Sequence, residues 1–477
     1  MKDILLLTIN AKWIHPSLAL RLLKANLGSL EDRCEIIELA LRQSMGEKTA
    51  PFIECRARIL GISVSIWNHI ATIELLEELE KVWAARAESA PDYKKPVVIL
   101  GGPEVSHLPP ESELFKFADY VICGEGEAAF PVLCTRILGE AQPQKTERPQ
   151  FISAAPVNLS EIKSGYHLYS DEDLAKKLIY VESSRGCPFN CEFCLSSVKS
   201  AEARAVREFP LEPFLAEMDE LAGRGARVFK FLDRTFNFNI DRALRIIEFF
   251  LKKITESKTP PIMAHFEMVP SLFPGELLEA LTRFPPNTLR LEIGIQTLNR
   301  ETAALIGRVC NPEEELEVLH FLCEKTNAIV HADLIAGLPG EDLASFGAGF
   351  DRLWAALTAF YPRVEIQTGI LKLLPGVPIS RHSEKFGMHF SPAPPYEVVE
   401  TASLSAGEVK RLKNFARFWE LIVNRGMAEL EAGKPVFSGF MALSDALLSH
   451  FGRNWGIDKN DLRDFLEYYD SWCFILH

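Results

Sequence analysis

The sequence predicts an α/β protein with three parts: a doubly wound parallel sheet, a partial (β/α)6 barrel of the TIM type and a helical C-terminal domain. Short apolar runs alternate with amphipathic helical patterns over the first 140 residues, and the alternation resumes near residue 178. The last hundred residues lose this alternation and become helical and aromatic. A chain of 477 residues is also too long for one ordinary domain.

We predict an N-terminal domain over residues 1–140. Glycine-rich loops, Gly101-Gly102-Pro103 and Gly124-Glu125-Gly126-Glu127, follow its last two predicted strands. Open sheets of this kind bind ligands beyond the carboxyl ends of their strands, where glycines let the backbone approach closely. The strands are expected at Ile4–Ile9, Ile59–Ile66, Pro96–Leu100 and Tyr120–Cys123, with helices at Ser17–Leu30 and Ile70–Ala87.

Residues 141–175 contain Pro, Gln and Ser without strong periodicity, which predicts a linker. The barrel is expected over residues 176–385, with its active site at the carboxyl ends of the strands. Its strands are expected at Leu178–Ser184, Val228–Leu232, Ile262–Glu267, Leu289–Ile295, Ile329–Ile335 and Val364–Leu371, and helices at Leu211–Ala222, Asp241–Ile254 and Pro312–Thr326.

Residues 386–477 are expected to form the helical domain. Ser405 and Glu408 have the spacing of a capping box, and Asp461–Tyr469 predicts a further helix. The pattern fits two interpretations: a domain that packs on the barrel, or a lid that covers the substrate.

Composition limits the classes of partner. The net charge of −13 and the lack of a basic cluster disfavour nucleic acid. The N-terminal apolar run is too short for a signal peptide, and nowhere do eighteen uncharged apolar residues run together, so we expect no membrane association. The ten cysteines are irregularly spaced apart from one cluster, which suits reduced thiols and a cytoplasmic protein.

That cluster is the most informative motif of the chain. Cys187, Cys191 and Cys194 have a C-x3-C-x2-C spacing, and Gly186 lets the loop curl. Three thiolates so spaced can bind three corners of one iron–sulfur cube and leave the fourth iron without a protein ligand. An open coordination position is typical of catalytic sites. The alternative is a structural zinc site, which needs a fourth Cys or His nearby, and within the next hundred residues only His265 is available.

This loop resembles the signature of the radical S-adenosylmethionine (radical SAM) superfamily. The resemblance implies a 4Fe–4S cluster held by Cys187, Cys191 and Cys194, with SAM bound to the unique iron and Phe193 next to the adenine. An electron from a reducing partner, such as flavodoxin or ferredoxin, then cleaves SAM to methionine and a 5′-deoxyadenosyl radical.

Polar residues at other strand ends are further candidates for SAM contacts. The resemblance implies a role for Asp233 near the SAM amino group and for Gln296 near the ribose, and Glu267 closes the third strand. Arg185 and Arg234 are candidates for the SAM carboxylate. The common Gly-Gly-Glu form is absent after the second strand, where Asp233 stands instead. Capping, salt bridging or solvation is the alternative for each side chain.

The N-terminal domain resembles the cobalamin-binding domain that precedes one class of radical SAM barrel. This implies that Gly101, Gly102, Gly124, Glu125 and Gly126 contact cobalamin. The Asp-x-His-x-x-Gly motif that ligates cobalt in the wider fold is absent. His15 is offset from that pattern, which favours a loop residue over a cobalt ligand, and the roles of His69 and His107 stay open. A domain that no longer binds cobalamin is the alternative.

The two resemblances imply a cobalamin-dependent radical SAM enzyme that transfers a methyl group to an unactivated carbon of a small molecule or peptide. Cyclisation or rearrangement with the same cofactors is one alternative, and a non-catalytic iron–sulfur or corrinoid-binding protein is another. The C-terminal segment resembles an uncharacterised domain that accompanies such proteins, and neither the substrate nor the oligomeric state follows from it.

Overall fold

The computed structural model describes residues 2–90, 92–139, 149–198, 205–256, 261–308, 310–430, 435–469 and 474–476. Backbone contacts divide the chain into two compact units. Unit 1 comprises Met1–Ser183 and Arg207–Lys230, and unit 2 comprises Ser184–Val206 and Phe231–His477. The segment with the three cysteines therefore belongs to unit 2, although it interrupts unit 1 along the sequence.

Unit 1 contains a six-stranded parallel sheet in the order β2-β1-β3-β4-β5-β6. The strand order reverses beside β1, and open α/β sheets bind ligands at such a point, beyond the carboxyl ends of the strands. The strands are β1 (Ile4–Asn10), β2 (Cys34–Ala40), β3 (Ile59–Ser63), β4 (Val97–Gly101), β5 (Tyr120–Gly124) and β6 (Gln150–Ala154).

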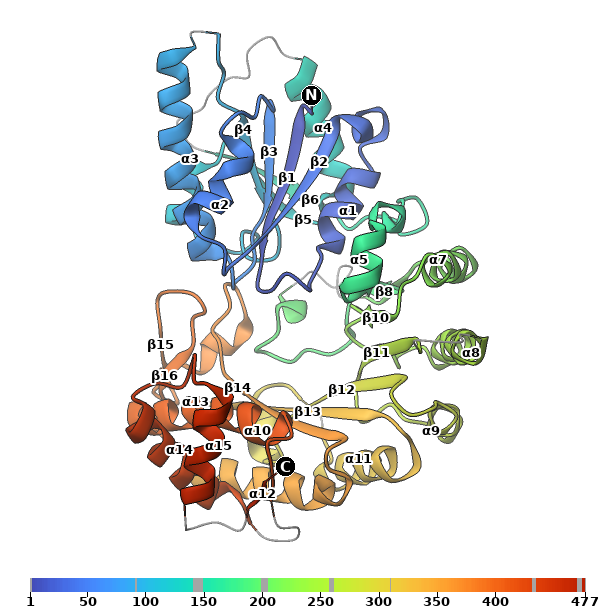
Figure 1. Cartoon of the computed structure of the whole chain (residues 1–477), viewed down its shortest axis with the longest axis vertical. Helices are drawn as coiled ribbons and strands as arrows, with labels where there is room; N and C mark the ends of the chain where they lie inside the picture. The colour runs from blue at the N-terminus through green and yellow to red at the C-terminus, as the bar shows by residue number, and fades with distance from the viewer. Residues whose placement is uncertain are drawn as a thin grey trace. The chain divides into compact units, whose positions relative to one another are not determined.

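Helices cover both faces of this sheet (Figure 1). Leu7 of β1 lies in a buried cluster with residues of α3 (His69–Ser89), whereas the adjacent Leu6 lies in a second cluster with residues of α1 (Leu18–Ala25) and α4 (Gly126–Gly139). Successive side chains of a strand point to opposite faces, so β1 supplies both layers. The doubly wound sheet predicted from the sequence is confirmed.

Two strands of the sheet were absent from the sequence prediction. β2 and β6 are edge strands with polar or exposed side chains, so their apolar pattern is weak. β6 and α5 (Asp171–Lys176) lie largely within the predicted linker, of which residues 141–148 lie outside the described residues. The helix predicted over Ser17–Leu30 ends at Ala25, and a 3₁₀ turn, Gly28–Arg33, follows it.

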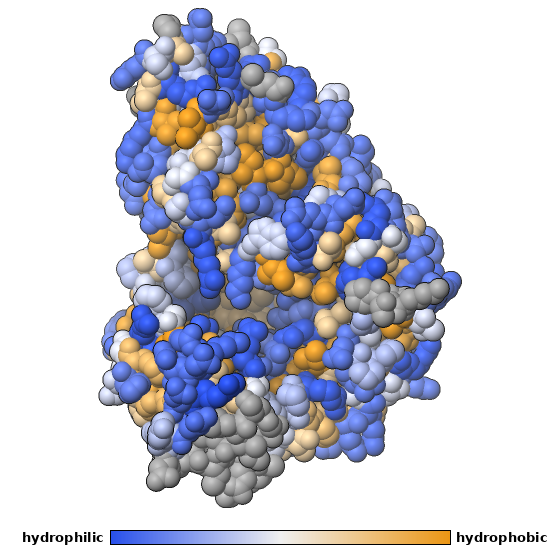
Figure 2. Space-filling model, in the orientation of Figure 1, coloured by the Kyte–Doolittle hydropathy of each residue, from blue (hydrophilic) through white to orange (hydrophobic). Residues whose placement is uncertain are grey.

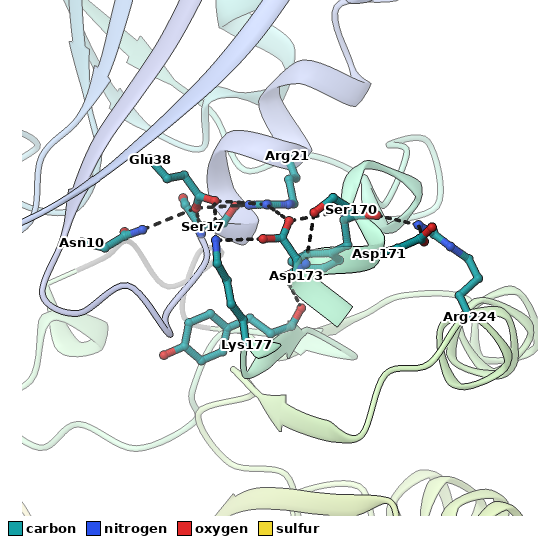
Figure 3. A network of polar contacts seen from close by, with 11 residues as sticks. Asn10, Ser17, Arg21, Glu38, Ser170, Asp171, Asp173, Lys177 and Arg224 are labelled. Atoms are coloured by element: carbon teal, nitrogen blue, oxygen red, sulfur yellow. Dashed lines mark hydrogen bonds and ion pairs between the residues drawn. The ribbon is translucent and has the colours of Figure 1, made fainter. Parts of the chain in front are cut away.

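A buried network of charges joins α1 and β2 to α5 within unit 1 (Figure 3). The Arg21 guanidinium donates to the Glu38 carboxylate at 3.1 Å and to the Asp173 carboxylate at 2.8 Å. Lys177 Nζ lies 2.8 Å from Asp173 and 3.7 Å from Glu38. None of the four side chains is more than 12% exposed. Two cations thus face two anions, which offsets the cost of removing the charges from water.

The strands of the barrel pattern fall in both units. In unit 2, β11 to β14 follow one another as parallel neighbours. The six predicted strands are present, except that the first, Leu178–Ser184, divides into β7 and a short β8. The strands of the barrel sheet are β7 (Ile179–Val181), β10 (Val228–Phe231), β11 (Met263–Met268), β12 (Leu289–Gln296), β13 (Ile329–Ala336) and β14 (Val364–Ile370). The short strands β8 (Ser184–Arg185) and β9 (Arg207–Glu208) are not part of this sheet.

Helices alternate with these strands as the sequence predicts. They are α7 (Leu211–Gly223), α8 (Ile240–Glu256), α9 (Gly275–Thr282), α10 (Arg300–Leu305), α11 (Pro312–Lys325) and α12 (Leu343–Leu357). The C-terminal region adds β15 (His389–Phe390), β16 (Val398–Glu400), α13 (Ala406–Trp419), β17 (Ala428–Leu430), α14 (Phe437–Phe451), α15 (Lys459–Tyr468) and β18 (Phe474–Leu476).

Aromatic rings attach the C-terminal helices to the rest of unit 2. The Phe350 ring of α12 has its centroid 5.0 Å from Phe415, 4.7 Å from Trp419 and 5.8 Å from Phe437. Edge-on and tilted contacts at these separations add to the apolar area that the rings bury. These contacts support the interpretation of a helical domain packed on the barrel, while a lid role stays a prediction.

The strands of unit 2 have one apolar face and one polar face, as the strict alternation of burial along β12 and β13 shows. On the polar face, His331 lies with Nδ1 2.9 Å from Glu365 and Nε2 3.2 Å from Asp333. Burial of the ring lowers its pKa, but the hydrogen bonds to the two carboxylates outweigh burial and raise the pKa to about 10.

Hydrophilic residues dominate the visible face of the molecule, with hydrophobic residues in smaller groups between them (Figure 2). Among the described residues, no helix is long and apolar enough to cross a membrane.

We predict that His331 gives the protein a pH-dependent contribution to stability. The imidazole pKa is near 6.5 in an unfolded chain and about 10 in the folded one. The folded pKa is the higher of the two, so this contribution is complete below about pH 6.5 and is lost as pH rises through about 10. The melting temperature of the wild type should therefore exceed that of H331Q most at pH 6, and the difference should shrink towards pH 10.

The control for this prediction is H320Q, because His320 is an exposed histidine of α11. Its melting temperature should follow the wild type across the same pH range. A constant difference between wild type and H331Q at every pH would contradict the prediction.

Candidate functional site

The three cysteines lie where the sequence places them, on the loop that leaves β8. Gly186 has a φ of 105°, a conformation that favours glycine and turns the chain into the loop. The Cys194 amide donates to the Cys191 carbonyl at 3.0 Å, and all three cysteines are half-buried. The loop is therefore short, folded and closed by its own backbone.

The surroundings of the thiols fit an iron–sulfur cluster. The Thr235 hydroxyl lies 3.5 Å from Cys187 Sγ. Burial raises the pKa of the Cys191 thiol, and the Arg308 guanidinium, which hydrogen-bonds to it, acts in the opposite direction. A cation beside a thiol favours the thiolate, the form that binds metal. Donors to the sulfurs and solvent exposure are also among the factors that set the reduction potential of such clusters.

A structural zinc site needs a fourth ligand beside the three cysteines. Among the described residues, no group of three or more His, Cys, Asp and Glu side chains, the three cysteines included, is arranged around one metal ion. The choice of a cluster over zinc therefore rests on the spacing of the three cysteines, and not on this geometry.

Asp233 lies directly beside the start of the cysteine loop. Its side chain is 1% exposed and accepts a hydrogen bond from the Ser184 hydroxyl at 2.7 Å. This contact gives Asp233 a structural role, and the predicted contact with SAM stays a prediction. The next residue, Arg234, is exposed, and Arg185 of β8 is half-buried.

Gln296 ends β12 in an unusual conformation. Its φ is 68°, in the left-handed region that costs a residue other than glycine about 1–3 kcal/mol. A Cβ at Gly294 would collide with the Gln296 side-chain amide, so the glycine makes room for that side chain. Strain of this kind persists where the surrounding structure fixes it, and such positions are concentrated at functional sites.

Glu341 helps to fix the turn that Gln296 and Thr297 form at the end of β12. The Thr297 hydroxyl donates to the Glu341 carboxylate at 2.6 Å and accepts from the Asn299 amide at 3.0 Å. Burial raises the pKa of Glu341 to about 7, although the Thr297 hydrogen bond lowers it. The loop after β13 thereby holds Thr297, the residue that follows the end of β12.

Glu267 is a half-buried residue of β11, paired in register with Glu292 of β12. Its carbonyl accepts from the Phe236 amide at 3.0 Å, which ties the loop after β10 to β11. Asp233, Thr235 and Glu267 thus come from connected segments of unit 2.

The glycine loops of unit 1 lie at the carboxyl ends of β4 and β5, as predicted. Gly102 and Gly124 have φ values near 100°, and a Cβ on either would meet the backbone of Val64 or Ala154 at 2.5 Å. The sheet itself therefore requires these two glycines. At Gly101 a Cβ would have no neighbour closer than 3.8 Å, which leaves it open to a ligand.

The other predicted residues of these loops have structural partners. Glu125 accepts a hydrogen bond from the Val157 amide at 3.0 Å and forms an ion pair with Arg207. Gly126 is the first residue of α4, close to a Leu23 methyl group. A cobalamin contact of either residue stays a prediction.

His15 is held within the loop after β1. Its Nδ1 lies 2.8 Å from the Tyr180 hydroxyl, the two rings are stacked, and the Ile14 carbonyl accepts from the Leu178 amide at 3.1 Å. Burial and the nearby Lys12 and Lys230 lower the pKa of His15. His69 is buried against Glu104 at 2.8 Å, and His107 is exposed.

Exposed apolar side chains lie in the loops that follow β1 and β3 and in the first turn of α3. Trp13, Trp67 and Ile70 are 52%, 53% and 48% exposed. Large apolar side chains near the switch point of an open sheet fit a large, flat organic cofactor better than they fit bulk water.

Several residues that support the site escaped the sequence prediction. Thr235 and Glu341 follow the predicted strands that end at Leu232 and Ile335, but the sequence does not show which residue after a strand makes the contact. Arg308 and Glu192 have no sequence signal, because their contacts join segments far apart in the chain.

The comparison with protein families agrees with this geometry. Residues 181–352 match the radical SAM superfamily, and residues 384–429 match a family described as protein of unknown function (DUF4080).

Curated relatives align with parts of the chain. The ribosomal protein uS12 methylthiotransferase RimO of Gloeobacter violaceus is 24% identical over 235 residues, which are 48% of this chain and 50% of that protein. The uncharacterized methyltransferase PH0819 of Pyrococcus horikoshii is 32% identical over 168 residues, 31% of this chain and 36% of that protein. The chain thus spans half or less of the length of these two relatives.

Two solved structures share the fold over most of the chain. The radical SAM methyltransferase TsrM from Kitasatospora setae, solved with tryptophan and a SAM analogue, is 18% identical, with a TM-score of 0.58 and coverage of 82% of this chain and 79% of its own. The cobalamin-dependent radical enzyme OxsB, solved with aqua-cobalamin and SAM, is 14% identical, with a TM-score of 0.61 and coverage of 98% and 75%. The family match and the cysteine loop agree: residues 181–352 of this chain form a radical SAM domain.

Proposed function

We propose that this protein is a cobalamin-dependent radical SAM methyltransferase that acts on a small molecule or peptide. The observation that carries the proposal is the folded Cys187, Cys191 and Cys194 loop after β8, in a chain that also contains a doubly wound sheet and shares its fold with TsrM and OxsB. Bound there, a 4Fe–4S cluster supplies the electron that cleaves SAM to methionine and a 5′-deoxyadenosyl radical.

The chain's own residues have defined parts in this proposal. The three cysteines ligate the cluster, and Phe193 lies by the adenine. Asp233 and Gln296 line the SAM site at the ends of β10 and β12, with Glu267 between them. Arg308 hydrogen-bonds to Cys191, and its guanidinium opposes the burial that raises the pKa of this thiol.

Cobalamin is proposed to bind unit 1 at the carboxyl ends of β1, β3 and β4. At Gly101 no nearby atom blocks the approach of a ligand to the backbone. The exposed rings of Trp13 and Trp67 are proposed to pack against the corrin macrocycle of cobalamin. His15 is not proposed as a cobalt ligand, because Tyr180 already occupies its Nδ1 and the loop lacks the ligating motif.

A second candidate is methylthio transfer, which the four RimO relatives favour. Cyclisation or rearrangement without methyl transfer stays a third. The proposed partners are a one-electron reductant such as flavodoxin or ferredoxin and the substrate. The nine described cysteines are all free thiols, which supports the proposed cytoplasmic location.

The first prediction concerns the cluster. Anaerobically reconstituted protein should hold about four irons in this site and cleave SAM when reduced. The triple variant C187A/C191A/C194A should lose the iron and the cleavage, because no thiolate remains. Cys323 is a buried cysteine of α11, so C323A is the control and should keep both. Cleavage by the triple variant would refute the proposal.

The second prediction concerns cobalamin. Protein produced with cobalamin and purified without oxygen should contain about one corrinoid per chain, since a ligand enclosed by the protein leaves slowly. The electron paramagnetic resonance spectrum of its cobalt(II) form should lack nitrogen hyperfine splitting from a protein ligand, and H15A should leave that spectrum unchanged. Protein that takes up no corrinoid would exclude cobalamin dependence, and nitrogen splitting that H15A removes would make His15 the ligand.

The third prediction separates the candidate reactions. Methyl transfer uses one SAM as methyl donor and a second as radical source, so S-adenosylhomocysteine and 5′-deoxyadenosine should appear in equal amounts. Cyclisation or rearrangement should give 5′-deoxyadenosine alone. A methylthiotransferase should give a product that contains added sulfur, which mass spectrometry detects. Turnover without S-adenosylhomocysteine would refute methyl transfer and leave the cluster chemistry intact.

A further inference from the structure

Glu192, which stands between Cys191 and Cys194, has a buried carboxylate inside the cysteine loop. It is 8% exposed. Arg381 holds it with two parallel hydrogen bonds, one from Nε at 2.9 Å and one from Nη2, and His382 Nε2 lies 3.1 Å from the same carboxylate. Both partners come from the 3₁₀ turn Pro378–His382, which follows β14.

The backbone of Glu192 is fixed as firmly as its side chain. Its amide donates to the Ile306 carbonyl at 3.0 Å, and its carbonyl accepts from the Ile379 amide at 3.0 Å. Gly307, with a φ of 69°, passes so close that a Cβ there would lie 2.9 Å from the Asn190 carbonyl. The centre of the cysteine loop is therefore held between the end of α10 and the turn after β14.

We propose that Glu192 is a positioning residue that sets the separation of Cys191 and Cys194 for cluster binding. A buried carboxylate without partners is costly, whereas an Arg fork fixes both its position and its orientation. The flanking cysteines are one and two residues away, so their Cα atoms follow the anchored residue. This inference rests on the proposed function only in taking the thiols as cluster ligands.

The opposing explanation is purely electrostatic: Glu192 and Arg381 would change the cluster only through their charges. The two explanations differ in what E192Q and R381Q do. Each variant removes the ion pair between Glu192 and Arg381, but E192Q removes a negative charge and R381Q removes a positive one. Positioning predicts the same effect from both variants, and electrostatics alone predicts opposite shifts of the reduction potential.

The experiment compares full-length wild type, E192Q, R381Q, the double variant and D445N. Asp445 is the matched control, because it accepts a similar fork from Arg411 in the C-terminal region. Hydrogen exchange of peptide 186–197 is measured by mass spectrometry on the apo-protein. Iron release to bathophenanthroline, the electron paramagnetic resonance line shape of the reduced cluster and the reduction potential of the cluster are measured on reconstituted protein.

We expect E192Q and R381Q each to speed exchange and iron release about tenfold, the size expected for a lost hydrogen bond to a charged group. Both should broaden the resonance line, and the double variant should exceed neither single variant, because both remove one interaction. D445N should match the wild type. Arg381 has a side chain that is 65% exposed, so R381Q tests the inference even if E192Q does not fold.

The inference is overturned if both single variants match the wild type, or if their effects add in the double variant. Opposite potential shifts with unchanged exchange and line shape would also overturn it, in favour of electrostatics. A wild type that binds no iron refutes the proposed function instead, and the exchange comparison on apo-protein still decides the role of Glu192.

Discussion

Unit 1 depends on the pairing of four charges that are buried together. Arg21, Glu38, Asp173 and Lys177 come from α1, β2, α5 and the residue after it, so one network connects the edge of the sheet to the chain that enters β7. Each charge is tolerable only while its partners are present, since removing one partner of a buried pair costs about 3–5 kcal/mol. The network thus makes α5, which lies within the predicted linker, part of the packed structure of unit 1.

The cysteine loop is held by backbone hydrogen bonds, by contacts to two of its thiols and by the ion pair of Glu192. Thr235, in the loop after β10, contacts Cys187. Arg308, just after α10, hydrogen-bonds to Cys191. The turn after β14 binds Glu192 through Arg381. Each support comes from the carboxyl end of a different βα repeat. This is the arrangement that lets a barrel place a reactive group on loops while its strands stay rigid.

The sequence predicted those features that have a periodic apolar pattern or a motif of defined spacing. The apolar strands β1, β3, β4 and β5, the six barrel strands and the cysteine loop are where their patterns place them. It missed β2 and β6, because edge strands with polar side chains lack an apolar run. It could not show that Gly102 and Gly124 are required by neighbouring backbone, or that Glu125 pairs with Arg207, since these contacts depend on tertiary structure.

The interleaving of the two units has a consequence for biosynthesis. Ser184–Val206 leaves the ribosome before Arg207–Lys230, which unit 1 still needs. Unit 1 therefore cannot be completed before the cysteines have been synthesised, and nascent chains expose three thiols while the fold around them is unfinished. A domain that is contiguous in sequence does not have this constraint, because it can fold as soon as its own residues have left the ribosome. Because of the same interleaving, a single proteolytic cut cannot separate the two units with both of them intact.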